Sequence, residues 1–141
     1  MEVKLKIKYD SGKLAGNWSK IVKKTLSRYA RSSAKGAKKN IDKGLKPALK
    51  KSTLIIRKQR GRTGTKPLFE TGNLHRSITA KKDTLTMNSY GAEHHKGFTT
   101  RANSMIPKKK VPARPFIEPD KQEILTVFDA LKRDIAKNFR K

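Results

Sequence analysis

Three histidines, His75, His94 and His95, are the side chains of this chain that could exchange protons near neutral pH. His94 and His95 are adjacent and point in different directions on either a helix or a strand. A zinc site needs two or three further ligands, and no His-Glu-x-x-His or comparable spacing is present. Because the chain has no cysteine, thiolate chemistry, disulfides and cysteine metal sites are excluded. We therefore expect no metal site, and His95 with Gly97 is better explained as a packing and turn element.

Other catalytic arrangements are equally hard to find. A nuclease would need clustered carboxylates to hold a metal beside the phosphate, whereas the acids here are scattered singly or lie in the last 24 residues. No serine or threonine belongs to a recognisable nucleophile motif. The glycines of residues 60–66 do not form a phosphate loop, because Lys66 is misplaced relative to the hydroxyls. We expect no enzyme activity and no cofactor.

Charge is the strongest chemical signal. The chain has 36 Lys and Arg against 11 Asp and Glu, a net charge of +25 in 141 residues. Residues 11–69 hold eighteen of the basic residues and only one acid, Asp42. One interpretation is that lysines solvate the outer face of a helix. The other is that the surplus faces a polyanion such as nucleic acid.

Two segments concentrate basic residues outside any apolar pattern. Residues 57–67 contain two glycines and no apolar residue other than Pro67, which predicts a mobile basic loop, and residues 98–110 predict a flexible crossing. Stacking aromatics and a helix-turn-helix are missing, so we expect contacts to phosphates that ignore base sequence. The candidates are Arg57, Lys58, Arg60, Arg62, Lys66, Lys108, Lys109 and Lys110.

The elements that would position these residues follow from apolar spacing. Residues 2–9 alternate apolar and charged side chains, which predicts an edge strand. Three- and four-residue steps from Leu14 to Tyr29 predict a long amphipathic helix. Its stripe continues to Ile41, Leu45 and Leu49, and Gly36, Gly44 and Pro47 are expected to interrupt it.

The second half predicts shorter elements. We expect a helical turn over 71–78, a hairpin of 78–82 with 84–89 turning near Asp83, a helical turn over 91–96, and an extended edge segment over 111–117. Asp120 with Glu123 forms a capping box. A final helix then follows with the apolar face Ile124, Val127, Phe128, Leu131, Ile135 and Phe139.

This order predicts a single α+β domain over residues 1–141: a small, mostly antiparallel sheet packed against a long N-terminal helix and a C-terminal helix. No apolar stretch approaches membrane-spanning length, and residues 1–9 alternate apolar and charged side chains where a signal peptide would have a continuous apolar run. We expect a soluble protein without membrane contacts.

Three motifs over about residues 68–120 add a family resemblance. Residues 69–74 read Phe-Glu-Thr-Gly-Asn-Leu and lead to Ser77-Ile78, residues 90–97 read Tyr-Gly-Ala-Glu-His-His-Lys-Gly, and residues 112–117 read Pro-Ala-Arg-Pro-Phe-Ile. Their order and spacing resemble the virion morphogenesis and tail-completion (neck) proteins of tailed bacteriophages. The chain departs from that pattern at Gly91, which separates Tyr90 from Ala92. The matched positions, expected either to pack or to form an interface between subunits, are Thr71, Gly72, Leu74, Ser77, His95, Gly97, Arg114, Pro115 and Phe116.

The resemblance implies a structural subunit of a sixfold homo-oligomeric ring at the head-proximal end of a phage tail. Its partners would be other copies of the chain, tail-tube or tail-terminator proteins, head-connector proteins, and phage DNA held non-specifically in the lumen. The protein would assemble in the host bacterial cytoplasm and end in the virion. The competing hypothesis is a monomeric, basic nucleic-acid-binding protein without sequence preference, which the charge supports equally well.

Overall fold

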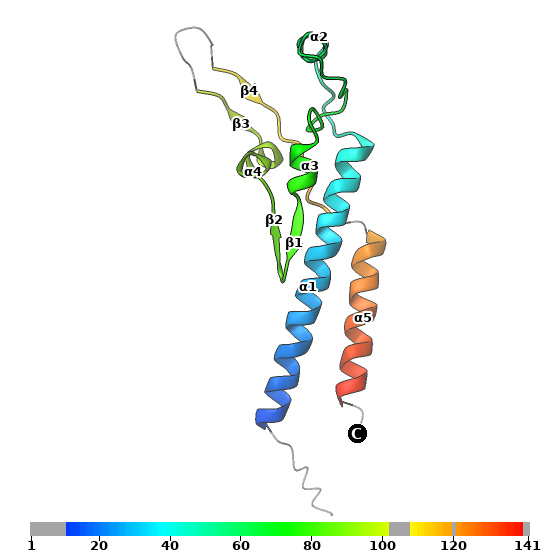
Figure 1. Cartoon of the computed structure of the whole chain (residues 1–141). Coiled ribbons are helices and arrows are strands. Elements are labelled where there is room, and N and C mark those ends of the chain that lie inside the picture. Colours follow the sequence, from blue (N-terminus) through cyan, green and yellow to red (C-terminus); the bar gives the residue numbers. More distant parts are fainter. Residues whose placement is uncertain (1–10, 102–107, 120, 140–141) are drawn as a thin grey trace, which may run out of the picture.

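One long helix organises the molecule, with a β-hairpin along one side and a second helix along the other (Figure 1). The computed structural model describes residues 11–101, 108–119 and 121–139. The strand predicted for residues 2–9 and the helix cap predicted at Asp120 lie outside these residues. The α+β class with antiparallel strand pairing is confirmed.

Helix α1 (Ser11–Lys43) runs unbroken past Gly36 and ends just before Gly44. The interruption predicted at Gly36 is therefore wrong, whereas the one at Gly44 is right, and Leu45 and Leu49 lie beyond the helix. A glycine inside a helix costs about 1 kcal/mol relative to alanine. Burial of the face that carries Ala34, Ala37 and Ile41 offsets this cost.

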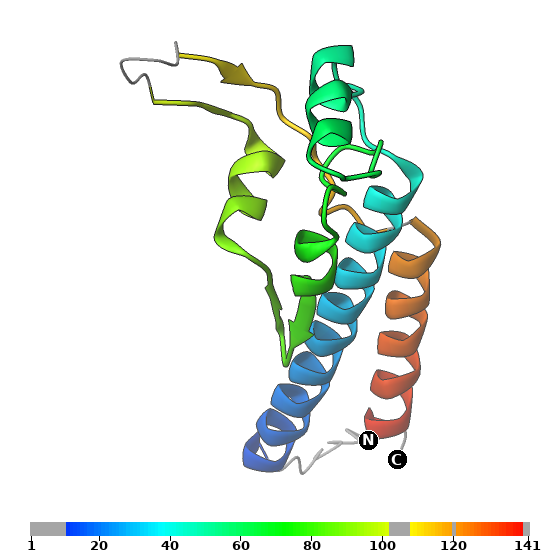
Figure 2. The same cartoon turned by 45° about the horizontal axis from the view of Figure 1, so that its top comes forward.

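Helix α5 (Lys121–Phe139) packs against α1, and both Figure 1 and Figure 2 show the two helices side by side. Glu123, near its start, pairs with Lys35 (3.5 Å), and Asp134, near its end, pairs with Arg28 (2.6 Å). Because rising numbers in α5 meet falling numbers in α1, the two helices are antiparallel. The predicted last helix is confirmed, and it covers α1 on the side away from the first hairpin.

The short elements of the second half lie close to their predicted places. Helix α3 (Asn73–Ser77) leads into strands β1 (Thr79–Lys81) and β2 (Thr84–Thr86), which pair antiparallel with Ala80 opposite Leu85. The hairpin turns at residues 82 and 83, as predicted. Helix α4 (Ser89–Lys96) follows it.

Two predicted loops are more ordered than expected. Helix α2 (Lys51–Gln59) includes the start of the segment predicted as a mobile basic loop. Strand β3 (Phe98–Thr99) pairs antiparallel with β4 (Lys110–Val111), so the predicted crossing from 98 to 110 begins and ends in a ladder. The two hairpins form separate two-stranded sheets.

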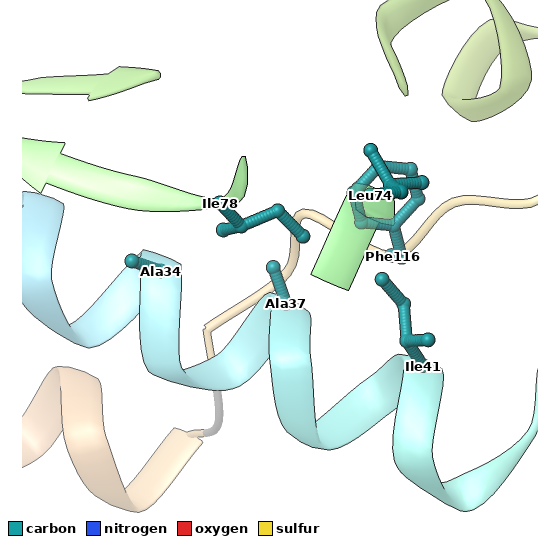
Figure 3. Packing of buried hydrophobic residues seen from close by; sticks show 6 residues of the cluster. All are labelled: Ala34, Ala37, Ile41, Leu74, Ile78 and Phe116. Atoms are coloured by element: carbon teal, nitrogen blue, oxygen red, sulfur yellow. The ribbon is translucent and has the colours of Figure 1, made fainter. Parts of the chain in front are cut away.

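The core lies where α1, α3 and the segment before α5 meet (Figure 3). Ala34, Ala37 and Ile41 come from α1, Leu74 comes from α3, and Phe116 comes from the extended segment before α5 and lies beside Leu74 and Ile41. Ile78, between α3 and β1, completes the cluster. Small alanines on α1 let the hairpin and the extended segment approach the helix closely.

Candidate nucleic-acid interface

The three sequence motifs converge in space, beginning at Ser77. The Ser77 hydroxyl donates to the carbonyl of Leu74 (2.8 Å) and accepts from the backbone N–H of Asn88 (3.1 Å). Asn88 precedes α4, so this one hydroxyl ties the end of α3 to the start of α4. Leu74 is buried in the core, Gly72 caps the start of α3, and Thr71 is exposed, with its carbonyl bonded by Arg76 (3.1 Å).

His95 joins the second motif to the third. Its Nδ1 accepts a hydrogen bond from the backbone N–H of Phe116 (3.1 Å), so Nδ1 is the unprotonated nitrogen of this ring. The two rings also meet edge to face, with centroids 5.5 Å apart. The packing role predicted for this histidine agrees with these contacts.

Two glycines allow α4 and β3 to approach their neighbours. Gly97 has φ +77°, and a Cβ there would lie 2.7 Å from the backbone nitrogen of Ala113. At Gly91, the position that departs from the family pattern, a Cβ would lie 2.8 Å from both a Leu74 methyl and the Met87 sulfur. The glycine at 91 therefore lets α4 pack directly on the core leucine.

The Arg114-Pro115-Phe116 element lies between core and surface. Phe116 is fully buried, Pro115 is exposed, and the backbone N–H of Arg114 donates to the carbonyl of His94 (3.0 Å). Asn40 of α1 donates to the carbonyls of Phe116 and Glu118 (3.1 Å each). These contacts favour packing at Phe116, because they fasten the segment before α5 to α1.

Arg57 corrects the prediction of a mobile loop. It lies in α2 and is buried, and its Nη1 donates to the carbonyls of Gly64 (2.7 Å) and Lys66 (3.0 Å). Arg57 therefore holds the following loop against the helix by binding its backbone. A candidate for phosphate contact in the sequence is an internal clamp in the structure.

The remaining basic candidates fall into two groups. Arg62 donates to Glu70 (2.7 Å), and Lys66 donates to the carbonyl of Asp42. The hydrogen bond from Arg62, reinforced by the charge of Arg57, holds the pKa of Glu70 below its ordinary value against the effect of burial. The second group of basic candidates is exposed, and its side chains make no hydrogen bond within the described residues. It consists of Lys58, Arg60, Lys108, Lys109 and Lys110.

The structure brings the two basic segments together around one cavity of about 580 Å³. Arg57 and Arg62 border it from the α2 side, and Lys109 and Lys110 border it from the β4 side. Segments more than forty residues apart in the chain thus form one cationic region. We call this region, with the exposed Lys58, Arg60 and Lys108 beside it, the cationic end.

His94 also lines this cavity, a position that the sequence analysis does not predict. Its ring packs edge to face on Tyr90 and Phe98, and its Nδ1 is buried without a hydrogen-bond partner. Burial, and then the charge of Arg114, lower the pKa of His94. The four-residue step from Tyr90 to His94 was the available signal, since it places both rings on one face of a helix.

Within the part of the chain that the structure describes, no group of three or more histidine or acidic side chains could hold a metal ion. No helix in these same residue ranges is long and apolar enough to cross a membrane.

The chain matches no family model, no curated protein and no solved structure. The resemblance to tail-completion proteins thus depends on the motifs of residues 68–120, whose side chains converge as described above.

Proposed function

We propose that this chain is a structural virion protein of the tail-completion type, a subunit of a homo-oligomeric ring around a DNA channel. The observation that carries the proposal is an exposed apolar face on the helix pair, in a molecule whose other end is strongly cationic. Self-association would cover the apolar face, and nucleic acid would neutralise the charge of the cationic end.

The apolar face consists of exposed side chains on both helices. Val22, Leu26 and Tyr29 of α1 and Leu125 and Phe128 of α5 are each at least 40% exposed. Soluble monomers rarely leave a contiguous apolar patch of several large side chains in water.

Helical geometry explains why the apolar face is left open. Lys24, Arg28 and Lys35 of α1 pair with Asp134 and Glu123 along one side of the helix contact. The ion pairs lie along one edge of the contact between the two helices. At 100° per residue, Val22 and Tyr29 of α1 lie along the other edge, and Phe128 of α5 lies along that same edge. The ion pairs hold the two helices together while the apolar rows remain available.

A second copy of the chain is the occupant we infer for this face. The core cluster has only six buried residues within the described ranges, a modest core for 141 residues, and association supplies buried area that such a chain lacks. The resemblance to tail-completion proteins implies that six copies form the ring. It also implies that the ring lies between the tail tube or terminator and the head connector. The cationic end would then border the DNA.

Assembly state tests the proposal directly. We expect sedimentation velocity and negative-stain images of the protein to show a ring-sized particle, and the double variant Val22→Glu, Leu26→Glu to lose it. The matched control is Lys23→Glu, an exposed residue between the two, which should assemble normally.

Purified virions give the decisive comparison, because a subunit can stay monomeric until its partners are present. We expect mass spectrometry to find the chain in mature particles. A monomer that binds DNA tightly and is missing from virions would instead support the monomeric nucleic-acid-binding protein.

A further inference from the structure

The cavity at the cationic end has features that the ring proposal does not use. It lies between α2, the segment before α3, α4 and the strand β4. Much of its lining is apolar and comes from Leu49, Leu68, Leu74, Val111 and Pro112. The lining also holds two buried guanidinium groups, which is an unusual combination, because charged groups inside proteins are normally paired.

These two guanidiniums are incompletely satisfied. Arg57 and Arg114 are each 8% exposed. The Nε of Arg57 is buried without a hydrogen bond, and Arg114 uses its Nε on the carbonyl of Pro47 (3.1 Å). Within the described residues, the two terminal nitrogens of Arg114 make no hydrogen bond, and Arg114 is one of the residues that line the cavity.

The lining of the cavity contains few carboxylates to pair with these arginines. Glu70 is the one acidic residue among those lining the cavity, and Arg62 already binds it at 2.7 Å. Its other oxygen is 3.8 Å from the Nε of Arg57, too long for a hydrogen bond. Arg114 therefore has no carboxylate partner in the described chain.

The electrostatics of the neighbouring groups agree with this geometry. Burial, and then the charge of Arg57, lower the pKa of Arg114. The charge of Arg114 in turn helps to lower the pKa of His94. Each group experiences a local excess of positive charge, which a bound anion would remove.

We propose that this cavity binds a carboxylate attached to an apolar group, as presented by an acidic segment of a partner protein. The carboxylate would bridge the fork of Arg114 in a bidentate pair and approach the Nε of Arg57. The apolar lining would cover the adjoining side chain. A nucleic-acid backbone fits less well, because its phosphates would leave the leucines and Val111 without an apolar partner.

N-acetyl-leucine is the simplest probe of this chemistry, since it joins a carboxylate to a leucine side chain. We expect its titration into the full chain to shift the Nε–Hε NMR signals of Arg114 and Arg57 in a saturable way. The neutral amide of N-acetyl-leucine should leave both signals in place. Equal shifts from the amide, or a uniform drift of all arginine signals, would overturn the proposal.

Two variants separate binding from folding. Arg114→Gln should weaken binding at least tenfold, as expected for loss of a charge-assisted pair, and the exposed Arg31→Gln on α1 should not. Thr53→Glu places a carboxylate on α2 at the edge of the cavity. It should abolish binding and raise the Tm, because the arginines then have an internal partner.

Competition identifies the source of the anion. If inorganic phosphate or a short oligothymidine displaces N-acetyl-leucine and binds more tightly, the site belongs to nucleic acid and the proposal fails. The outcome is independent of assembly, because the ring can form or fail to form without changing the preference of this cavity.

Discussion

Phe116 connects the segment before α5 to α1, α3 and α4. It is fully buried among α1, α3 and Ile78, and its backbone binds His95 and Asn40. Replacing it by alanine removes a large apolar contact and leaves a cavity where the motifs meet. We expect Phe116→Ala to lower the free energy of unfolding by about 3–5 kcal/mol in urea denaturation.

Phe128→Ala is the matched control for this change. Phe128 is 55% exposed, so in the monomer the same substitution should cost less than about 1 kcal/mol. Similar losses for the two variants would show that Phe116 is not the centre of the core.

His94 gives the fold a dependence on pH. Because the pKa of His94 is lowered in the folded chain, its neutral form is the one that the fold retains. The stability it contributes is complete above the ordinary histidine pKa of 6.5 and is lost as the pH falls below that value, when the unfolded chain takes up a proton. We expect the free energy of unfolding to fall by up to about 1.4 kcal/mol per pH unit below this point.

The variant His94→Phe isolates the effect, since phenylalanine keeps the edge-to-face contacts with Tyr90 and Phe98. Denaturation midpoints between pH 7 and pH 5 should change less in this variant than in the unmodified chain. Parallel pH profiles would assign the dependence to other groups.

The motif positions come from the family resemblance, whereas the basic candidates come from residue type and local composition. Leu74, His95 and Phe116, three of the motif positions, lie in or against the core. The residues that follow Arg57 in sequence are polar or charged, a pattern that predicts a surface cation. Arg57 is buried because it binds the carbonyls of Gly64 and Lys66, which the following loop brings back against α2. The local sequence pattern does not predict this path of the loop.

At the scale of elements, α2 and the loop after it behave as one unit. Arg57→Gln removes both bonds that hold the loop and should lower the free energy of unfolding by about 1–3 kcal/mol. The double variant Lys58→Gln, Arg60→Gln changes only exposed side chains of the same segment. It should melt within a degree or two of the unmodified chain in circular dichroism and bind DNA more weakly.

A loss of stability in the double variant as large as that in Arg57→Gln would contradict this division of roles.

Elements with long apolar periods were predictable, and those held by distant contacts were not. The stripes of α1 and α5 and the hairpin turn near Asp83 all follow from local spacing. Helix α2 was missed because it ends in charged residues, although Gly61 just beyond its end is a typical helix stop. The β3–β4 pairing joins residues more than ten apart without alternating apolar residues, so local pattern gave no sign of it.

Exposed large apolar side chains lie on the helix pair and also on α2, at Ile55 and Ile56, and basic residues lie on α1 and α5 as well as around α2 and β4. A net charge of +25 predicts nucleic-acid binding that depends steeply on salt and not on base sequence. We expect anisotropy titrations with two unrelated oligonucleotides to give equal affinities and the same negative slope of log K against log salt. A tenfold preference for one of them would contradict contacts made only to phosphates.

Helix α1 carries exposed apolar residues near one end and the core residues Ala34, Ala37 and Ile41 toward the other. Its 33 residues span about 50 Å without a break, and in Figure 1 its lower end reaches past the tip of the first hairpin. A continuous helix of this kind is stiff and has no hinge along it. A partner that binds the apolar face and tilts α1 would therefore tilt the core residues of the same helix as well.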